Sequence, residues 1–177
     1  KAFKTLGLLT SKPVLYVCNV SEEDAAEGNA WSQSVEVMSK EKNAECVRVC
    51  ASIEAEIAQL SEPSERAEFL ETIGLSEPGL NKIIRAGNTL LNLQTYFTCG
   101  PKETRAWTVP IGAKAPQAAG VIHGDFEKGF IKAEVIAFDD YIANGGENGA
   151  KDAGKMRQEG KEYVVHDGDV ILFRFNV

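Results

Sequence analysis

Short apolar runs alternate with helical periodicities over the first half of the chain. Residues 13–19 form an apolar run, which predicts a strand buried on both faces, as in a parallel sheet. Residues 30–43 predict an amphipathic helix with apolar side chains at i, i+4 and i+7: Trp31, Val35 and Met38. Residues 45–50 alternate as a second strand. Three more helical patterns follow: 53–60, 64–73 and 78–91. This order predicts an α/β segment with parallel strands.

The pattern changes after residue 91. Alternating residues flank a Cys-Gly-Pro turn at 99–103 and predict a β-hairpin over 92–109. A helix-capable segment covers 112–120. Two later strands have these predicted buried faces: Ile131, Ala133, Val135 and Ala137, then Ile171, Phe173, Phe175 and Val177. Between them, residues 139–160 are Gly-rich and charged, with at most a short helix near 149–158. This order predicts a small α+β unit compatible with a ubiquitin-like β-grasp fold.

Charge and composition narrow the class of protein. No apolar run of about 18 residues is present, so we expect no membrane span. The four cysteines lack the density of a disulfide framework, which favours reduced thiols and a cytoplasmic protein. The net charge of -7 argues against general polyanion binding, so an RNA contact needs a local basic face. Candidate side chains for such a face, or ordinary solvated cations, are Lys102, Arg105, Lys114, Lys128, Lys132, Lys151, Lys155, Arg157 and Lys161.

The first predicted strand ends in Asn19-Val20-Ser21-Glu22. Guanine-specific P-loop enzymes carry Asn-Lys-x-Asp at such a strand end, where the Asp accepts hydrogen bonds from guanine. Here Val20 replaces the Lys, and Glu22 is one methylene longer than Asp. An Asn amide both donates and accepts, which suits the N6/N7 edge of adenine. Adenine is therefore at least as plausible a ligand as guanine.

A second candidate element closes the next predicted strand and opens a helix. Its residues Cys50-Ala51-Ser52 form a loose version of the Ser-Ala-Lys turn that lays backbone N–H groups against the base in the same enzymes. Two such elements in the right order, separated by one helix, carry more weight than either alone. The competing interpretation is an ordinary strand-to-helix turn of small residues.

A third pattern offers metal chemistry instead. His123, Asp125 and Glu127 stand at alternate positions and could ligate a metal if the stretch were extended. The competing interpretation makes His123 a hydrogen-bonding residue at a turn. With two histidines in the chain and no nucleophile-elbow sequence, a His-based hydrolase has little support.

Several longer motifs resemble one known family. They are Lys114-Ala-Pro-Gln-Ala-Ala-Gly120, the segment from Val121 to Glu134, the segment from Glu159 to Asp169, and Phe173-Arg-Phe-Asn-Val177. Together they look like the C-terminal TGS domain of the YchF/Obg-like ATPases. In the first half, Asn19–Glu22 is similar to that family's altered base motif, and Val49–Glu56 to its last nucleotide-binding turn.

The resemblance implies three parts. Residues 1–12 would end a helical coiled-coil insertion, 13–90 would be the C-terminal part of a P-loop nucleotide-binding domain, and 91–177 would be a β-grasp TGS domain. Asn19 would pair with the adenine edge, Val20 would contact the base through its backbone, and Glu22 belongs to the same motif. Cys50, Ala51 and Ser52 would complete the base pocket.

The resemblance also implies a parent ATPase that uses Mg²⁺, accepts GTP less well, and associates with the ribosome through the large subunit and rRNA. The phosphate loop, the switch segments and the Mg²⁺ ligands are absent from these residues. We therefore expect a piece of a longer protein that has no catalytic residues and needs no cofactor. Two alternatives stay open: a metal-dependent enzyme using His123, Asp125 and Glu127, and a free-standing ubiquitin-like binding module.

Overall fold

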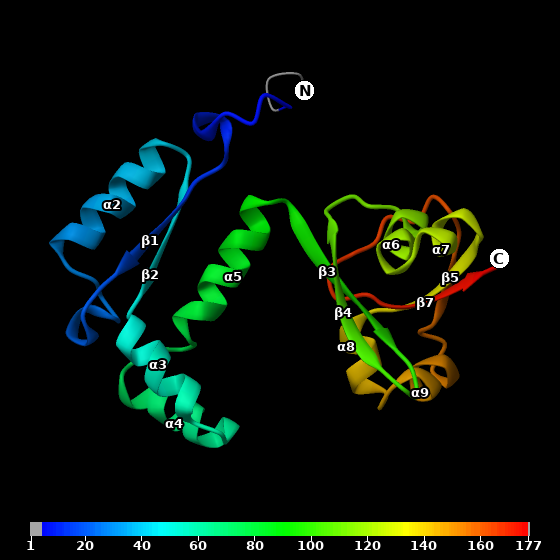
Figure 1. Cartoon of the computed structure of the whole chain (residues 1–177). Helices are drawn as coiled ribbons and strands as arrows, with labels where there is room; N and C mark the ends of the chain where they lie inside the picture. The colour runs from blue at the N-terminus through cyan, green and yellow to red at the C-terminus, as the bar shows by residue number, and fades with distance from the viewer. Residues whose placement is uncertain (1–4, 177) are drawn as a thin grey trace. The chain divides into compact units, whose positions relative to one another are not determined.

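The computed structural model describes residues 5–176, and the chain divides into two compact units, Lys1–Leu91 and Asn92–Val177 (Figure 1). Each unit has its own sheet and its own apolar cluster, so each is described by itself. The mixed α/β class predicted from the sequence is confirmed. Within residues 5–176, no helix is both long and apolar enough to cross a bilayer.

Unit 1 is built on two parallel strands, β1 (Leu15–Asn19) and β2 (Glu45–Val49). Helix α2 (Ala30–Glu41) makes the crossover that parallel pairing requires. On the face of β2 toward α2, Arg48 forms an ion pair with Glu36 at 3.2 Å. Two short 3₁₀ turns complete this part of the chain: η1 (Leu9–Ser11) and η2 (Glu22–Asp24).

Three helices follow β2: α3 (Ala51–Gln59), α4 (Pro63–Thr72) and α5 (Gly79–Leu90). Helices α3 and α4 share a buried apolar cluster formed by Cys50, Ile53, Ile57 and Leu70. Helix α5 lies on the other face of β2, where its first residue meets Val49 (Figure 1). A Cβ at position 79 would stand 2.8 Å from a methyl carbon of Val49, so any larger residue there would have to displace the Val49 side chain.

Two predictions about burial in unit 1 are wrong. The first strand is not buried on both faces, because Val17 is 46% exposed. Trp31 does not lie on the buried face of α2: its side chain is 82% exposed, and the helix instead buries Ser32 and Ser39. The Asn29 capping box fixes the rotation of α2 about its axis, because the Ser32 hydroxyl accepts a hydrogen bond from the Asn29 N–H at 3.0 Å.

Unit 2 contains a five-stranded sheet in the order β4-β3-β7-β5-β6. Its strands are β3 (Leu93–Cys99), β4 (Thr104–Pro110), β5 (Phe130–Ile136), β6 (Arg157–Glu159) and β7 (Val170–Phe175). Its helices are α6 (Ala115–Ile122), α7 (Gly124–Lys128), α8 (Phe138–Ala143) and α9 (Glu147–Asp152). The predicted hairpin is confirmed by the antiparallel β3–β4 pairing, and β3 and β7 are parallel.

The core of unit 2 lies between the sheet and α6. Its centre is Tyr96, fully buried, whose hydroxyl donates to the Ala118 carbonyl at 2.8 Å. Other core residues come from every long strand and from α6: Val109, Ala115, Ala119, Ala133, Val135, Ile171 and Phe173. The predicted inward positions Ile171 and Phe173 are confirmed, and Val177 lies outside the described residues.

Two further predictions for unit 2 need correction. The register of β5 shifts between Phe130 and Lys132, so Phe130 enters the core and Ile131 is 57% exposed instead. Residues 139–160 hold more structure than expected, because α8, α9 and β6 occupy most of this Gly-rich stretch. Gly145 and Gly146, both at positive φ, make the break between the two helices.

A carboxylate from α3 holds the start of α5. Pro78 at the N-cap of α5 has no hydrogen-bonding side chain. Instead, the two carboxylate oxygens of Glu54 accept hydrogen bonds from the N–H groups of Gly79, at 2.6 Å, and Leu80, at 3.1 Å. The contact satisfies two N–H groups that a helix start leaves open and joins segments 25 residues apart.

We predict that Glu54→Ala destabilises unit 1 by about 1.5–3 kcal/mol, the range for a lost hydrogen bond to a charged group. Urea unfolding followed by circular dichroism measures the change. Glu56→Ala is the matched control, since Glu56 is exposed on the same helix and should change stability by less than about 0.5 kcal/mol. Equal effects of the two substitutions would contradict the capping role.

Candidate functional site

The two predicted base-reading elements meet at one edge of the β1–β2 sheet. Asn19, the last residue of β1, lies opposite Val49, the last residue of β2. The Asn19 side-chain oxygen accepts a hydrogen bond from the Ala51 N–H at 3.0 Å. Next to it, the Val20 N–H donates to the Val49 carbonyl at 2.9 Å. Segments 32 residues apart are therefore fixed to one another at this edge.

The second element begins helix α3. Cys50 is 4% exposed and lies in the apolar cluster below, and its sulfur is 3.1 Å from the Ser52 hydroxyl. Ala51 and Ser52 are exposed at the surface. The Cys50 side chain, at the N-cap of α3, makes no capping hydrogen bond. The Asn19 side chain from β1 instead accepts a hydrogen bond from the Ala51 N–H. The first N–H group of α3, that of Ala51, therefore points at the strand edge where Asn19 lies.

The acidic end of the first element lies apart from this contact. Glu22 begins η2 and is exposed. Its loop is held by Asp24, whose carboxylate accepts hydrogen bonds from Asn29 at 2.8 Å and Ser21 at 2.9 Å. These two hydrogen bonds lower the pKa of Asp24, and the bond from Asn29 has the larger effect. Within residues 5–176, no hydrogen bond joins Glu22 to Asn19 or to the start of α3.

A hollow of about 270 Å³ lies beside Asn19. This Asn19 hollow is lined by residues of the strand end and of α2: Cys18, Asn19, Val20, Asn29, Trp31, Ser32 and Val35. Trp31 and Asn29 are site residues that the sequence reasoning missed. The sequence signal that could have identified them is the Asn29–Ser32 capping pair. It fixes the rotation of α2 so that the Trp31 ring is exposed at the rim of the hollow. A base can stack on such a ring.

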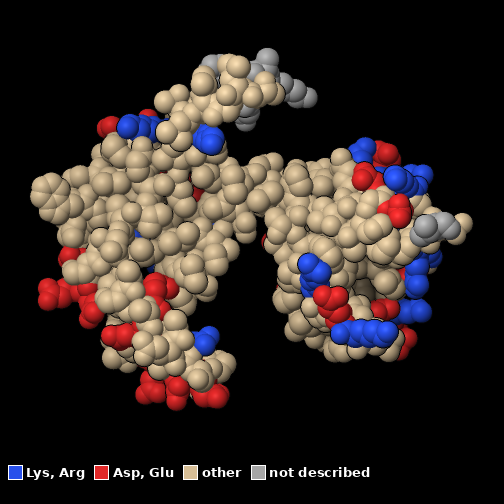
Figure 2. All heavy atoms as spheres, in the orientation of Figure 1, with Lys and Arg blue, Asp and Glu red and all other residues tan. Residues whose placement is uncertain are grey.

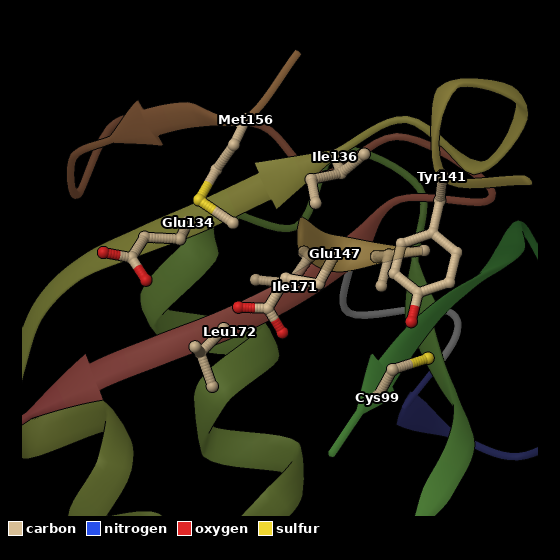
Figure 3. Close-up of a pocket in the computed structure, with 9 residues that line it drawn as sticks. Cys99, Glu134, Ile136, Tyr141, Glu147, Met156, Ile171 and Leu172 are labelled. Carbon is tan, nitrogen blue, oxygen red and sulfur yellow. The ribbon is translucent and has the colours of Figure 1, made fainter. Parts of the chain in front are cut away.

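A second hollow, in unit 2, is too small for a substrate. It lies between the sheet and the segment carrying α8 and α9, with a volume of about 10 Å³, room for one water molecule (Figure 3). Cys99 and Tyr141 face one another at one end of it (Figure 3). Burial, together with a hydrogen bond to Cys99, raises the pKa of Tyr141.

The metal site suggested by His123, Asp125 and Glu127 is contradicted. The stretch forms helix α7 instead of an extended segment, so alternate residues do not share a face. His123 caps this helix, because its Nδ1 accepts a hydrogen bond from the Asp125 N–H at 3.2 Å. Across the described residues, no group of three His, Cys, Asp or Glu side chains is placed to hold a metal ion.

The basic side chains of unit 2 do not form an uninterrupted positive face. On the visible side of this unit, Lys and Arg are interspersed with acids (Figure 2). Six of the nine predicted basic residues have a carboxylate within 4.0 Å: Arg105, Lys114, Lys128, Lys132, Lys155 and Arg157. The other three have no ion pair among the described residues: Lys102, Lys151 and Lys161.

Comparison with known proteins gives a consistent family. The family model YchF-GTPase_C, a protein of unknown function (DUF933), matches residues 93–176. The chain is 60% identical over 176 residues to the ribosome-binding ATPase YchF of Haemophilus ducreyi, covering 99% of this chain and 48% of that protein. It is 56% identical over 179 residues to the protein of the same name from Bacillus subtilis, covering 100% and 49%.

A solved structure extends the similarity to the fold. The YchF GTPase of Schizosaccharomyces pombe superposes with a TM-score of 0.83 at 37% identity, covering 97% of this chain and 46% of that one. The chain spans about half the length of the curated relatives it matches. It therefore belongs to the YchF/Obg-like family and corresponds to the C-terminal part of its members.

Proposed function

We propose that this chain supplies the base-reading edge of an ATP-binding domain together with an interaction module of a ribosome-associated ATPase. The observation that carries the proposal is the hydrogen bond from the Ala51 N–H to Asn19, which joins the two strand ends at 3.0 Å. Relatives named ribosome-binding ATPase match nearly all of the chain, unit 1 included. A free-standing ubiquitin-like module would not require unit 1, so we favour the ATPase assignment.

The domain assignment has three parts. Residues 13–90 are the C-terminal part of a P-loop nucleotide-binding domain, and 91–177 are a TGS domain of β-grasp type. The division between Leu91 and Asn92 and the separate sheets support this boundary. Residues 1–12 end a helical insertion, of which 1–4 lie outside the described residues.

In the proposed base pocket, the hydrogen-bonding capacity is already partly used. One lone pair of the Asn19 oxygen is engaged by Ala51, which leaves its amide N–H₂ group and the second lone pair for the N7/N6 edge of adenine. The Val20 N–H is engaged by Val49, so Val20 has its carbonyl available to the base.

Ser52 adds an N–H at the start of α3, whereas buried Cys50 shapes the pocket from below. Glu22, exposed in the same motif, is one methylene longer than the Asp that pairs with guanine in guanine-specific enzymes. The Asn19 amide by itself suits adenine, which supports a preference for ATP over GTP.

Hydrolysis needs parts that these residues do not provide. Bound Mg²⁺ would neutralise charge on the phosphates during transfer. A phosphate loop of the form G-x-x-x-x-G-K-[ST], whose Ser or Thr would help to hold that ion, does not occur in these residues. The chain therefore contributes to recognition of the base, and phosphate chemistry belongs to the remainder of a full-length protein.

We predict that Asn19→Ala in a full-length protein weakens ATP binding by roughly 1–3 kcal/mol, the range for a bidentate base contact. Isothermal titration calorimetry measures the affinity. Asn19→Asp separates two roles, because Asp keeps the acceptor for the Ala51 N–H and loses the donor to the base. Asn81→Ala, exposed on α5, is the control. Unchanged ATP affinity in Asn19→Ala would overturn the base-pocket assignment.

For the 177-residue chain alone, we predict no ATP hydrolysis above a protein-free blank. The physical reason is the missing phosphate cradle and its transition-state charge stabilisation. Release of inorganic phosphate over several hours, with a full-length relative as the positive control, measures it. Turnover by the purified chain would show that catalytic groups lie within these residues.

Unit 2 is the proposed ribosome-binding module, acting on the large subunit and on rRNA. If its cations contact phosphates, ribosome co-sedimentation should fall at least tenfold between 50 and 200 mM salt. Lys151→Glu combined with Lys161→Glu should flatten this dependence, since neither lysine is paired with an acid among the described residues. Binding that does not respond to salt would point to a protein partner.

A further inference from the structure

Two thiols face one another across the β1–β2 pair. Cys18 of β1 pairs in register with Arg48, and Cys46 of β2 pairs with Tyr16, so the cysteines lie diagonally on the same face of the sheet. Their sulfur atoms are 3.7 Å apart, and both residues are free and partly exposed. A disulfide needs the sulfurs at about 2.0 Å and the Cα atoms within about 7 Å. Diagonal strand neighbours stand about 7–8 Å apart, so closure has to move the backbone of the strands as well as the side chains.

Small oxidants can reach this pair from one side. Cys18 lines the Asn19 hollow, whose volume of about 270 Å³ admits a molecule of peroxide size. The other cysteines differ in their surroundings. Cys50 is 4% exposed and contacts a serine hydroxyl, and Cys99 lies in unit 2 beside Tyr141. Among the described residues, the Cys18–Cys46 contact is the one sulfur-to-sulfur contact found.

The surroundings also order the two thiols in reactivity. Burial, then the contact with Cys18 and the nearby Glu36, raises the pKa of Cys46 to about 11, and Arg48 opposes this rise. Cys46 therefore remains a thiol at neutral pH. A protonated Cys46 is a poor nucleophile, and Cys18 lines the hollow, so the oxidant meets Cys18 first.

We propose that Cys18 and Cys46 form an oxidisable dithiol, which hydrogen peroxide converts to an intramolecular disulfide beside Asn19. The Cys18 thiolate attacks one peroxide oxygen, the O–O bond breaks, and the departing hydroxide takes a proton to form water. The sulfur of Cys46 then attacks the Cys18 sulfenic acid, and the S–O bond breaks. Cys46 loses its proton and a second water leaves. Two thiols and one peroxide yield one disulfide and two waters.

Closure of this disulfide acts on the residue next in the chain. Shortening the sulfur separation from 3.7 Å draws the end of β1 toward β2. Asn19 follows Cys18 directly in the chain, and the hydrogen bond of 3.0 Å from the Ala51 N–H holds its side-chain oxygen in place. Oxidation should therefore move the amide of Asn19 away from the base-reading position. This consequence rests on the proposed function, whereas the dithiol itself does not.

Peptide mapping of the whole 177-residue chain tests the dithiol. After treatment with hydrogen peroxide and alkylation of the remaining thiols, mass spectrometry should find a Cys18–Cys46 linked peptide, with Cys50 and Cys99 alkylated. In Cys46→Ser, dimedone should trap a sulfenic acid at Cys18, and Cys99→Ser should oxidise like the unmodified chain. Oxidation at Cys99 first, sulfenic acid at Cys18 without a link, or four alkylated thiols would each overturn the proposal. The mapping of the unmodified chain decides the matter even if a variant does not fold.

A second measurement separates the dithiol from its link to the base pocket. In a full-length protein, the disulfide should weaken ATP binding at least fivefold, and dithiothreitol should restore the affinity. Cys46→Ser should keep its ATP affinity under the same oxidant. A disulfide that forms while ATP affinity stays constant would overturn the link to Asn19. If Asn19→Ala also left ATP affinity unchanged, the base-pocket assignment would fail and the mapped disulfide would stand.

Discussion

Parallel pairing of β1 and β2 is the constraint on which unit 1 and its site depend. Parallel strands bring their carboxyl ends to the same edge, so two sequence elements separated by a full helical crossover arrive side by side. Asn19 and Val49 are register partners for this reason. The side chain of Asn19 then accepts a hydrogen bond from the Ala51 N–H, so the strand register also fixes the position of the turn that begins α3. The diagonal approach of Cys18 to Cys46 has the same origin.

The helices of unit 1 are tied to this edge by polar contacts as much as by apolar burial. Its buried cluster is small, and Glu54 bridges the turn that opens α3 to the start of α5. Unit 2 has a larger core, with buried polar groups at its closing turn. There the carboxylate of Asp169 accepts hydrogen bonds from the Tyr163 hydroxyl at 2.7 Å and the His166 N–H at 2.9 Å. Buried polar groups that are paired in this way specify one arrangement of the chain.

The positions where sequence periodicity misled share a physical cause. Trp31 fits an amphipathic period, yet a cap at Asn29 sets the rotation of the helix and places serines inside. Ile131 fits the alternation of a strand with its side chain buried. A register shift between Phe130 and Lys132 buries Phe130 instead and leaves Ile131 exposed. Residues 139–160 read as a loop because glycines obscure short helices, which packing in unit 2 stabilises despite weak local preference. Local capping and sheet register thus override hydrophobicity at these positions.

The sequence by itself determined the order of strands and helices, the change of pattern near residue 91, and the two base-reading segments. Those features are local, since periodicity, turn residues and short motifs are properties of neighbouring residues. Only the tertiary structure decided that the Asn19 oxygen is engaged by Ala51, that Trp31 rims a hollow, and that Cys18 lies 3.7 Å from Cys46. It also turned the His123 segment from a candidate metal site into a helix cap. These are distances between side chains on different elements, and such distances exist only once register and packing are set.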